Sequence, residues 1–250
     1  MIVTRTEAFT DYLGWITNGG HWDDDVLEVI SRRMREDANH AKGDGRGRLR
    51  PSLIGHPCDR VQILSYHHLR PSTSDWRAWI GTWMHLAFDT YLVTEWPHRL
   101  QVEYPVIPAV GALGVTGKAD WYWYSTSETS MFRHISGPHL GDYKTIEKIS
   151  MVEAAPLDKH LEQLGYELFT LGMTTAYLVY QVRGFGTMAS YQLTLEPADT
   201  DRIAARLERL AVSLDTDSLP GMLDECKARK GLFRSCDFAQ ECLNHALAGQ

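Results

Sequence analysis

Long apolar runs, basic charge and cysteine are all scarce in this sequence. No stretch reaches the roughly 18 consecutive apolar residues that a membrane-spanning helix needs. The first 20 residues do not combine a basic segment with an apolar one, which argues against a secretory signal. We therefore expect a cytoplasmic protein without a membrane partner.

Cysteine occurs four times in 250 residues, and no two cysteines form a close Cys-x-x-Cys pair. The missing pair argues against an ordinary zinc ribbon. In a reducing compartment, cysteines are more often metal ligands or core residues than disulfide partners. One lies early in the chain and three lie late: Cys58, Cys226, Cys236 and Cys242. They could share one metal only if the two ends of the chain meet.

Basic residues number 25 against 32 acidic ones, which leaves a formal net charge of -7. Non-specific binding of nucleic acid depends on counterion release at Lys and Arg, so this charge argues against a protein that binds nucleic acid through its overall charge. Local clusters of basic residues could still bind nucleic acid. Two runs could each be a phosphate contact or a solvated charged loop: Arg46, Arg48 and Arg50, and Lys227, Arg229, Lys230 and Arg234.

Hydrophobic residues make up 44% and charged residues 23% of the chain, which is typical of a globular protein, and the length suits one domain with elaborated ends. Helical apolar spacing and two-residue alternation predict the order of elements. We expect helices at Asp23–Asn39, Cys58–His67 and Asp75–Trp96, strands at 100–106, Leu113–Ser125 and His139–Thr145, a helix at Pro156–Met173, a hairpin of Thr174–Val182 and Thr187–Leu195, and a helix at Pro197–Leu214. This order predicts an α/β fold.

Asp142-Tyr143-Lys144 stands on a predicted strand, and Asp120 stands on the strand before it. Alternate side chains point to one face, so Asp142 and Lys144 should lie on the same side with the Tyr143 carbonyl between them. Two carboxylates and a carbonyl are ligands that Mg2+ or Mn2+ prefers. Lys144 could orient a water molecule, stabilise negative charge, or transfer a proton if burial lowers its pKa. Asp-x-Lys alone is also common as a surface ion pair.

The order of motifs around these residues resembles the RecB-type branch of the PD-(D/E)XK nucleases. Gly117-Lys118-Ala119-Asp120 and Leu140-Gly141-Asp142-Tyr143-Lys144-Thr145 resemble the core motif of the superfamily. Gly81-Thr82-Trp83-Met84-His85 resembles an upstream helical motif whose histidine binds metal. Gln163-Leu164-Gly165-Tyr166 resembles a downstream Gln/Tyr motif, although many members place these two residues one position further apart.

The resemblance implies a restriction-endonuclease-like core sheet flanked by helices, with an active site drawn from several segments. The catalytic residues would be Asp120, Asp142, Lys144, Gln163 and Tyr166. The ligands of Mg2+ or Mn2+ would be His85, Asp120, Asp142 and the Tyr143 carbonyl. Further candidates are Glu103 as an additional acid, and Tyr122 or Tyr143 as aromatic residues that stack on unpaired bases or pack in the core.

The cysteine pattern resembles the iron–sulfur exonucleases of the same branch, which include CRISPR-associated, helicase-linked and phage proteins. The resemblance implies a [4Fe-4S] cluster bound by Cys58, Cys226, Cys236 and Cys242 that ties the N- and C-terminal segments together. Four thiolates suit Zn2+ as well, and buried cysteines without a metal are a third interpretation. The predicted organisation is an N-terminal helical arm with a basic loop at 1–50, a nuclease core at 51–225 and an iron–sulfur-binding tail at 226–250.

Together these features predict a metal-dependent DNA exonuclease that hydrolyses phosphodiesters. The resemblance implies action on single-stranded DNA or DNA ends in recombination, repair or CRISPR spacer acquisition, in the host cytoplasm if the protein is phage-encoded. It also implies a helicase, recombinase or CRISPR integrase as a partner. Two other classes stay open: a non-catalytic, cluster-containing DNA-end-binding partner in a larger complex, and a zinc-stapled nucleic-acid binder. The sequence predicts neither cleavage polarity nor oligomeric state.

Overall fold

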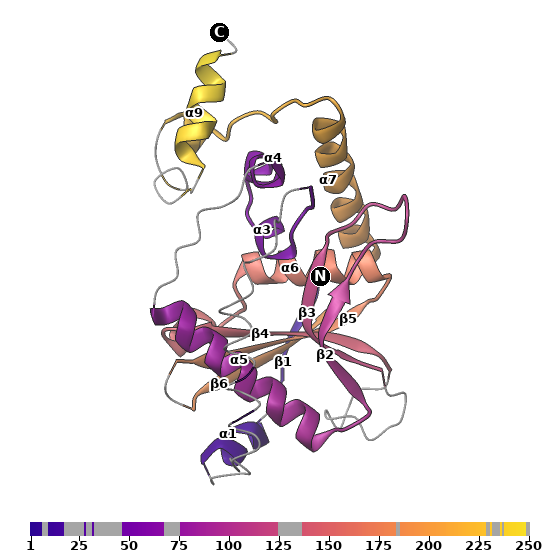
Figure 1. Cartoon of the computed structure of the whole chain (residues 1–250), viewed down its shortest axis with the longest axis vertical. Coiled ribbons are helices and arrows are strands. Elements are labelled where there is room, and N and C mark those ends of the chain that lie inside the picture. Colours follow the sequence, from indigo (N-terminus) through magenta and orange to yellow (C-terminus); the bar gives the residue numbers. More distant parts are fainter. Residues whose placement is uncertain are drawn as a thin grey trace.

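The computed structural model has one six-stranded sheet with helices on both sides (Figure 1). It describes residues 1–6, 10–17, 47–67, 76–124, 137–183, 186–228 and 238–248, and residues 28, 32, 231 and 236 singly. The helices are α1 (Thr10–Thr17), α3 (Pro51–Ile54), α4 (Asp59–His67), α5 (Trp76–Glu95), α6 (Asp158–Leu171), α7 (Pro197–Asp215), α8 (Asp224–Lys227) and α9 (Ala239–Ala248), with a 3-10 turn η1 (Ile149–Met151). None of these described helices is long and apolar enough to span a membrane.

The strand order in the sheet is β1-β6-β5-β4-β3-β2. The strands are β1 (Ile2–Thr6), β2 (Leu100–Val106), β3 (Gly117–Trp123), β4 (His139–Ile146), β5 (Thr175–Val182) and β6 (Met188–Thr194). β4 and β5 run parallel, and the other four neighbouring pairs are antiparallel. A parallel pair needs a crossover connection, which η1 and α6 provide here.

Each face of the sheet has its own core because side chains alternate along the strands. Leu178 and Tyr180 of β5 pack with α6 and α7 on one face. Tyr177 and Val179 of the same strand pack with α5 and α1 on the other face, in a core rich in aromatic rings. Figure 1 shows α5 and α6 on opposite sides of the sheet. The two helices that carry predicted site residues therefore approach β4 from opposite faces.

Most predicted elements agree with the structure to within a few residues, and the differences have local causes. The strand predicted from Leu113 begins only at Gly117, because the N–H groups of Val115 and Thr116 donate to Thr170 Oγ1 and to the Leu49 carbonyl instead of to a strand. β1 has no counterpart in the prediction, since this edge strand is largely exposed and carries a weak apolar pattern.

The N-terminal region is described in part. The helix predicted at Asp23–Asn39 lies outside the described residues, except for Glu28 and Arg32, which are helical. β1 adds an edge strand to the sheet from within the segment 1–50. The boundaries predicted at residues 50 and 225 stay predictions.

Candidate active site

Asp120 stands where β3 and β4 separate. The two strands pair from Trp121 to Trp123 against residues 139–141. Beyond that ladder, Asp120 Oδ2 accepts a hydrogen bond of 2.6 Å from the backbone N–H of Tyr143. We call the space between the two strands beyond their paired residues the β3–β4 gap. The N–H and C=O of one residue point to the same side of a strand, so the Tyr143 carbonyl faces this gap. The gap thus brings a carboxylate and a carbonyl together, as the sequence predicts for a metal site.

Asp142 and Lys144 form a buried ion pair beside this gap. Lys144 Nζ lies 2.8 Å from Oδ1 and 2.7 Å from Oδ2 of Asp142. The Asp142 side chain is 2% exposed and that of Lys144 is 21% exposed. Burying two charges is costly, so this pair differs from the surface ion pair that Asp-x-Lys forms by chance.

Burial alters the acid–base properties of these groups. It raises the pKa of Asp142 to about 7, against the opposing effect of the Lys144 ammonium. It also raises the pKa of Asp120. Burial alone would lower the pKa of Lys144, but Asp142 and Asp120 outweigh it and the pKa is raised. This direction of the pKa favours Lys144 as an ammonium that stabilises negative charge over a role in proton transfer.

His85 approaches the gap from α5. Its Nδ1 lies 3.6 Å from Asp120 Oδ2, and its ring meets that of Tyr143 edge-on at a centroid distance of 4.8 Å. Burial, followed by the positive charge of Lys144, lowers the pKa of His85 to about 4, so the imidazole is neutral at pH 7. Neutral imidazole is the form that binds metals. A Cβ at Gly81 would lie 3.3 Å from Thr145 Oγ1, a close contact that the glycine avoids where α5 approaches β4.

A groove opens from Asp120 to the surface. It is lined by Gly81, Thr82, His85, Leu86, Asp89, Glu103 and Asp120. The β2–β3 ladder is interrupted between the pairs Val102–Trp121 and Tyr104–Ala119, and Glu103 there has a φ of 50°. The Glu103 carboxylate lies 3.1 Å from the Lys118 ammonium at the surface. The additional acid that the sequence suggests therefore lines the groove next to Asp120.

α6 places Gln163, but not Tyr166, next to Asp142. Gln163 Nε2 lies 3.5 Å from Asp142 Oδ1. The Tyr166 hydroxyl lies 3.5 Å from Arg206 Nη1 on α7. Glu167, one position further along, accepts a hydrogen bond of 3.0 Å from Gln163 Nε2 and is fully buried. Sequence reasoning missed Glu167, although the more common spacing of the Gln/Tyr motif points to its position.

The aromatic candidates differ in exposure. Tyr143 is fully buried and its ring stacks on Phe88 at 4.5 Å, so it packs in the core and cannot stack on a base. Tyr122 is half-buried beside Tyr104, with ring centroids 4.4 Å apart. Of these two candidates, Tyr122 is the one that keeps part of its surface available for a base.

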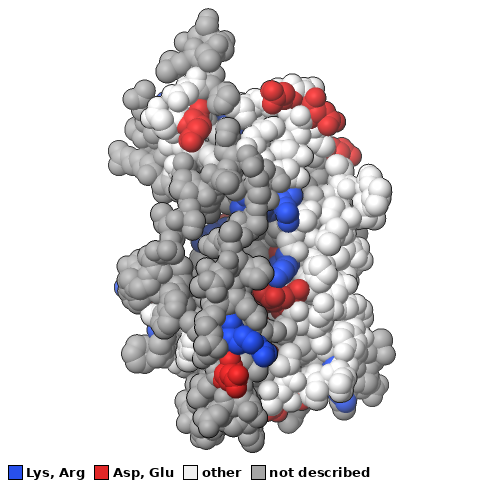
Figure 2. All heavy atoms as spheres, in the orientation of Figure 1, with Lys and Arg blue, Asp and Glu red and all other residues white. Residues whose placement is uncertain are grey.

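Among the described residues on the face drawn in Figure 2, Lys and Arg side chains lie in small groups that alternate with acidic groups. Lys227 pairs with Asp224 at 2.8 Å. Four members of the two basic runs lie outside the described residues: Arg46, Arg229, Lys230 and Arg234.

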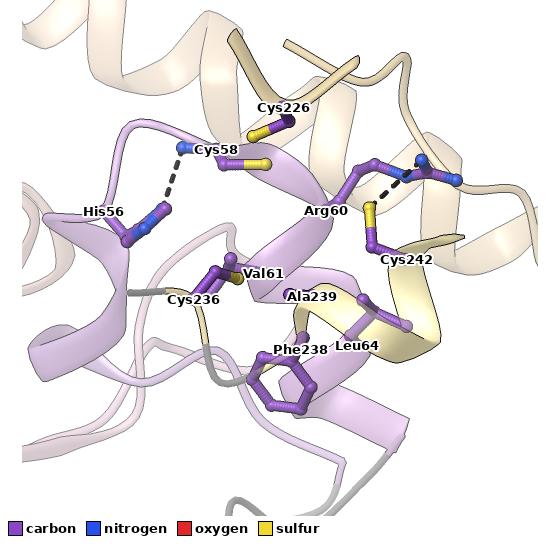
Figure 3. Close-up of a pocket in the computed structure, with 10 residues that line it drawn as sticks. All are labelled: His56, Cys58, Arg60, Val61, Leu64, Cys226, Cys236, Phe238, Ala239 and Cys242. Atoms are coloured by element: carbon purple, nitrogen blue, oxygen red, sulfur yellow. Dashed lines mark hydrogen bonds between the residues drawn. The ribbon is translucent and has the colours of Figure 1, made fainter. Parts of the chain in front are cut away.

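The four cysteines line one pocket, which they reach from different segments (Figure 3). Cys58 precedes α4, Cys226 belongs to α8 and Cys242 to α9. These three are nearly fully buried and Cys236 is half-buried, and none of the four forms a disulfide. The early and late cysteines therefore meet, as sharing a metal requires.

A buried arginine, Arg60, lines this pocket, and a partly buried one, Arg206, contacts the segment that precedes α4. Arg60, 6% exposed, donates from Nη1 to Cys242 Sγ at 3.2 Å, as Figure 3 shows. Arg206 of α7 donates to Asp59 Oδ1 at 2.8 Å and to the carbonyls of Ile54 and His56 at 2.9 and 2.7 Å. Arg206 thus holds the loop that carries Cys58.

The donor types suit the groups that the sequence predicts. Carboxylate, carbonyl and imidazole donors at the β3–β4 gap fit Mg2+ or Mn2+, and four thiols fit an iron–sulfur cluster or Zn2+. Among the described residues, no three His, Cys, Asp or Glu side chains are grouped closely enough to hold a single metal ion as placed. Metal occupancy at both places stays a prediction.

No protein-family model and no curated protein matches this sequence. Among solved structures, the alkaline exonuclease LHK-Exo from Laribacter hongkongensis is 11% identical, with a TM-score of 0.51 over 69% of this chain and 90% of that chain. The structure of LHK-Exo in complex with dAMP is 12% identical, with a TM-score of 0.51 over 68% of this chain and 89% of that chain. The structure of SSO0001 is 18% identical over 87% of this chain and 95% of that chain, but its TM-score of 0.47 is too low to support an argument. The chain therefore shares a mixed α/β fold with LHK-Exo.

Proposed function

We propose that this chain is a metal-dependent deoxyribonuclease, an exonuclease that hydrolyses phosphodiesters in single-stranded DNA or at DNA ends. The observation that carries the proposal is the meeting of Asp120, Asp142 and Lys144 where β3 and β4 part, beside an open groove. Structural ion pairs rarely combine such burial with a second carboxylate and a surface opening. The likeness of fold to LHK-Exo supports the same function by analogy.

Each residue has a distinct role in this proposal. Mg2+ or Mn2+ would supply Lewis-acid stabilisation and a more acidic bound water. Asp120, Asp142, the Tyr143 carbonyl and neutral His85 would hold the ion. Lys144 remains an ammonium and stabilises negative charge on the phosphoryl oxygens. Gln163 keeps the Asp142 carboxylate oriented.

DNA is the substrate that fits best. LHK-Exo, which shares the fold, has been solved in complex with dAMP. The groove carries three acidic side chains, so a phosphate can approach Asp120 only with cations beside it. The bound metal and Lys144 would be those cations, which makes phosphate binding local and consistent with a net charge of -7.

For the cysteine pocket we propose a [4Fe-4S] cluster, with Zn2+ as the alternative. Four buried or half-buried thiols from both ends of the chain, with the Arg60 guanidinium against one of them, support a centre of negative charge. Iron and sulfide analysis of aerobically and anaerobically purified protein separates the two metals, since zinc brings no sulfide and no visible colour.

The proposed setting is recombination, repair or CRISPR spacer acquisition, with a helicase, recombinase or CRISPR integrase as partner. The motif order and the cysteine pattern support it. Co-purification of the tagged chain with the products of neighbouring genes tests the partner.

A nuclease assay tests the proposed activity. Single strands labelled at the 5' or 3' end are incubated with Mn2+ and with wild type, Asp142→Ala, Lys144→Ala or Lys148→Ala. Lys148 is exposed on the same segment and serves as the matched control. We expect both site variants to lose about 1000-fold in rate and Lys148→Ala to retain it. Equal cutting by all four proteins would indicate a contaminant, and DNA binding without cutting would favour the non-catalytic alternative.

A further inference from the structure

α6 buries a second acid beside the ion pair of Asp142 and Lys144. Glu167 lies one helical turn after Gln163 and is 0% exposed. Gln163 Nε2 donates to Glu167 Oε1 at 3.0 Å, and the same nitrogen lies 3.5 Å from Asp142 Oδ1. The amide nitrogen of Gln163 is thus shared between two buried carboxyl groups.

This arrangement lowers the stability of the fold. Glu167 Oε2 is buried and has no hydrogen-bond partner among the described residues. Burial, and then the charge of Asp142, raises the pKa of Glu167 well above its ordinary range. An apolar side chain of similar length would avoid the unpaired oxygen. A residue that the fold alone would not favour is more readily explained by function.

We propose that Glu167 is a positioning residue for phosphodiester hydrolysis, because it holds the Gln163 amide with its nitrogen toward Asp142. A carboxamide has an N–H2 end and an oxygen end of similar shape, and either end fits the same space. Glu167 Oε1 accepts from the nitrogen, so it selects one of the two orientations. Without that acceptor the amide can rotate and place its oxygen against Asp142, which repels a carboxylate that has to bind a metal. The inference rests on the proposed function.

The residues next to Glu167 make other contacts. Lys144 occupies one side of the Asp142 carboxylate, at 2.8 and 2.7 Å, and Gln163 approaches Oδ1 from α6. Tyr166 is directed to Arg206, whose guanidinium carbon lies 5.7 Å from the ring centroid. Glu167 is therefore the residue of this helical turn that bonds to the Gln163 side chain.

The test compares Glu167→Met, Glu167→Gln, Gln163→Met and the double variant Gln163→Met/Glu167→Met. We expect Glu167→Met to lower kcat about tenfold with little change in KM, and to leave Tm unchanged or higher. Glu167→Gln keeps an acceptor oxygen and should lose much less. Since Glu167 acts through Gln163, the double variant should be no slower than Gln163→Met alone.

Two outcomes would overturn the inference. The first is that the fold-loss of kcat in the double variant equals the product of the fold-losses in the two single variants, because independent effects multiply. The second is that Glu167→Met lowers Tm in parallel with kcat, which would indicate a structural role.

A spectroscopic readout separates this inference from the proposed function. The side-chain N–H2 signals of Gln163, assigned by their absence in Gln163→Met, should be protected from solvent exchange in wild type and in Glu167→Gln. They should lose protection in Glu167→Met. This measurement does not depend on DNA cleavage. If the wild-type protein cleaves no DNA, the proposed nuclease function is refuted, but the exchange data still show whether Glu167 orients the Gln163 amide. Unchanged protection in Glu167→Met would refute the positioning role even in an active enzyme.

Discussion

The β3–β4 gap and the cysteine pocket both gather reactive side chains, but they do so by different means. At the gap, two neighbouring strands supply Asp120, Asp142 and Lys144, and the backbone of one strand bonds to a side chain of the other. At the pocket, the cysteines come from segments at both ends of the chain. The gap lies between two large cores, whereas the pocket is packed by a small cluster that includes Val61, Leu64 and Phe238.

The difference concerns which interactions hold each site. A sheet between two packed layers fixes the positions of its side chains whether or not a metal is bound. Segments that are distant in sequence and bury little apolar surface open locally at a low free-energy cost unless a covalent or metal link ties them. We therefore expect the pocket to depend on its metal more than the gap does.

The largest expected effect follows from Cys58→Ser. We expect iron or zinc per chain to fall to near zero and the amides of α9 to lose hydrogen-exchange protection by about 100-fold or more, because the link between the chain ends is lost. Amides of β4 and β5 should keep their protection. If the amides of the sheet lose as much protection as those of α9, the two regions do not differ in their dependence on metal. If the metal content is unchanged, Cys58 is not a ligand.

Gly141→Ala should produce the next largest effect. A Cβ at this position of β4 would overlap the indole of Trp121 on β3, which is fully buried and cannot move freely. We expect a loss of about 3 kcal/mol or more in the free energy of unfolding, measured by urea denaturation. Gly221→Ala is the matched control because nothing lies within 4 Å of its Cβ, and it should change stability by less than about 0.5 kcal/mol.

Arg206→Met tests how the Cys58 loop is held. The substitution leaves Asp59 and the carbonyls of Ile54 and His56 without their guanidinium donor. We expect a cost of about 2 kcal/mol and faster release of metal from the pocket. Arg209→Met is the control, since Arg209 is 62% exposed and 3.9 Å from Asp59, and it should have almost no effect. Equal effects of the two variants would mean that Arg206 does not support the pocket.

The smallest expected effect is a pH dependence of cleavage. Burial raises the pKa of Asp142 to about 7, so the carboxylate that would bind the metal is protonated as the pH falls through this value. We expect kcat/KM to fall about tenfold per pH unit below pH 7, and the midpoint to move lower as Mn2+ is increased, since metal and proton compete. Rates measured at two Mn2+ concentrations check this, and a flat profile down to about pH 5 would contradict it.

Much of the fold and part of the site could be predicted from sequence because both depend on local spacing. Alternation along β4 placed Asp142 and Lys144 on one side, and apolar periodicity identified α5 with His85. The order of the motifs pointed to Asp120, which the structure places at the β3–β4 gap. The failures came where a contact in three dimensions decided the outcome, as for the late start of β3 at Gly117, where Thr170 and Leu49 take the backbone hydrogen bonds.

Residue roles that depend on burial were harder to predict. Tyr143 belongs to the site motif, but its ring is in the aromatic core. Lys144 sits in a buried environment that should lower its pKa, yet two nearby carboxylates raise it. Tyr166 and Glu167 are adjacent, and only the docking of α6 against both β4 and α7 decides which of them faces Gln163.

By itself, the sequence determined the kinds of reactive groups, their order along the chain and the strands and helices that carry them, because these depend on residue type and on spacing between near neighbours. The tertiary structure decided that β3 and β4 part at Asp120, that Glu167 shares the Gln163 amide, and that the two ends of the chain bring four cysteines to one pocket. The physical reason is that desolvation, pairing of charges and closure of long loops all depend on contacts between segments that are far apart in sequence.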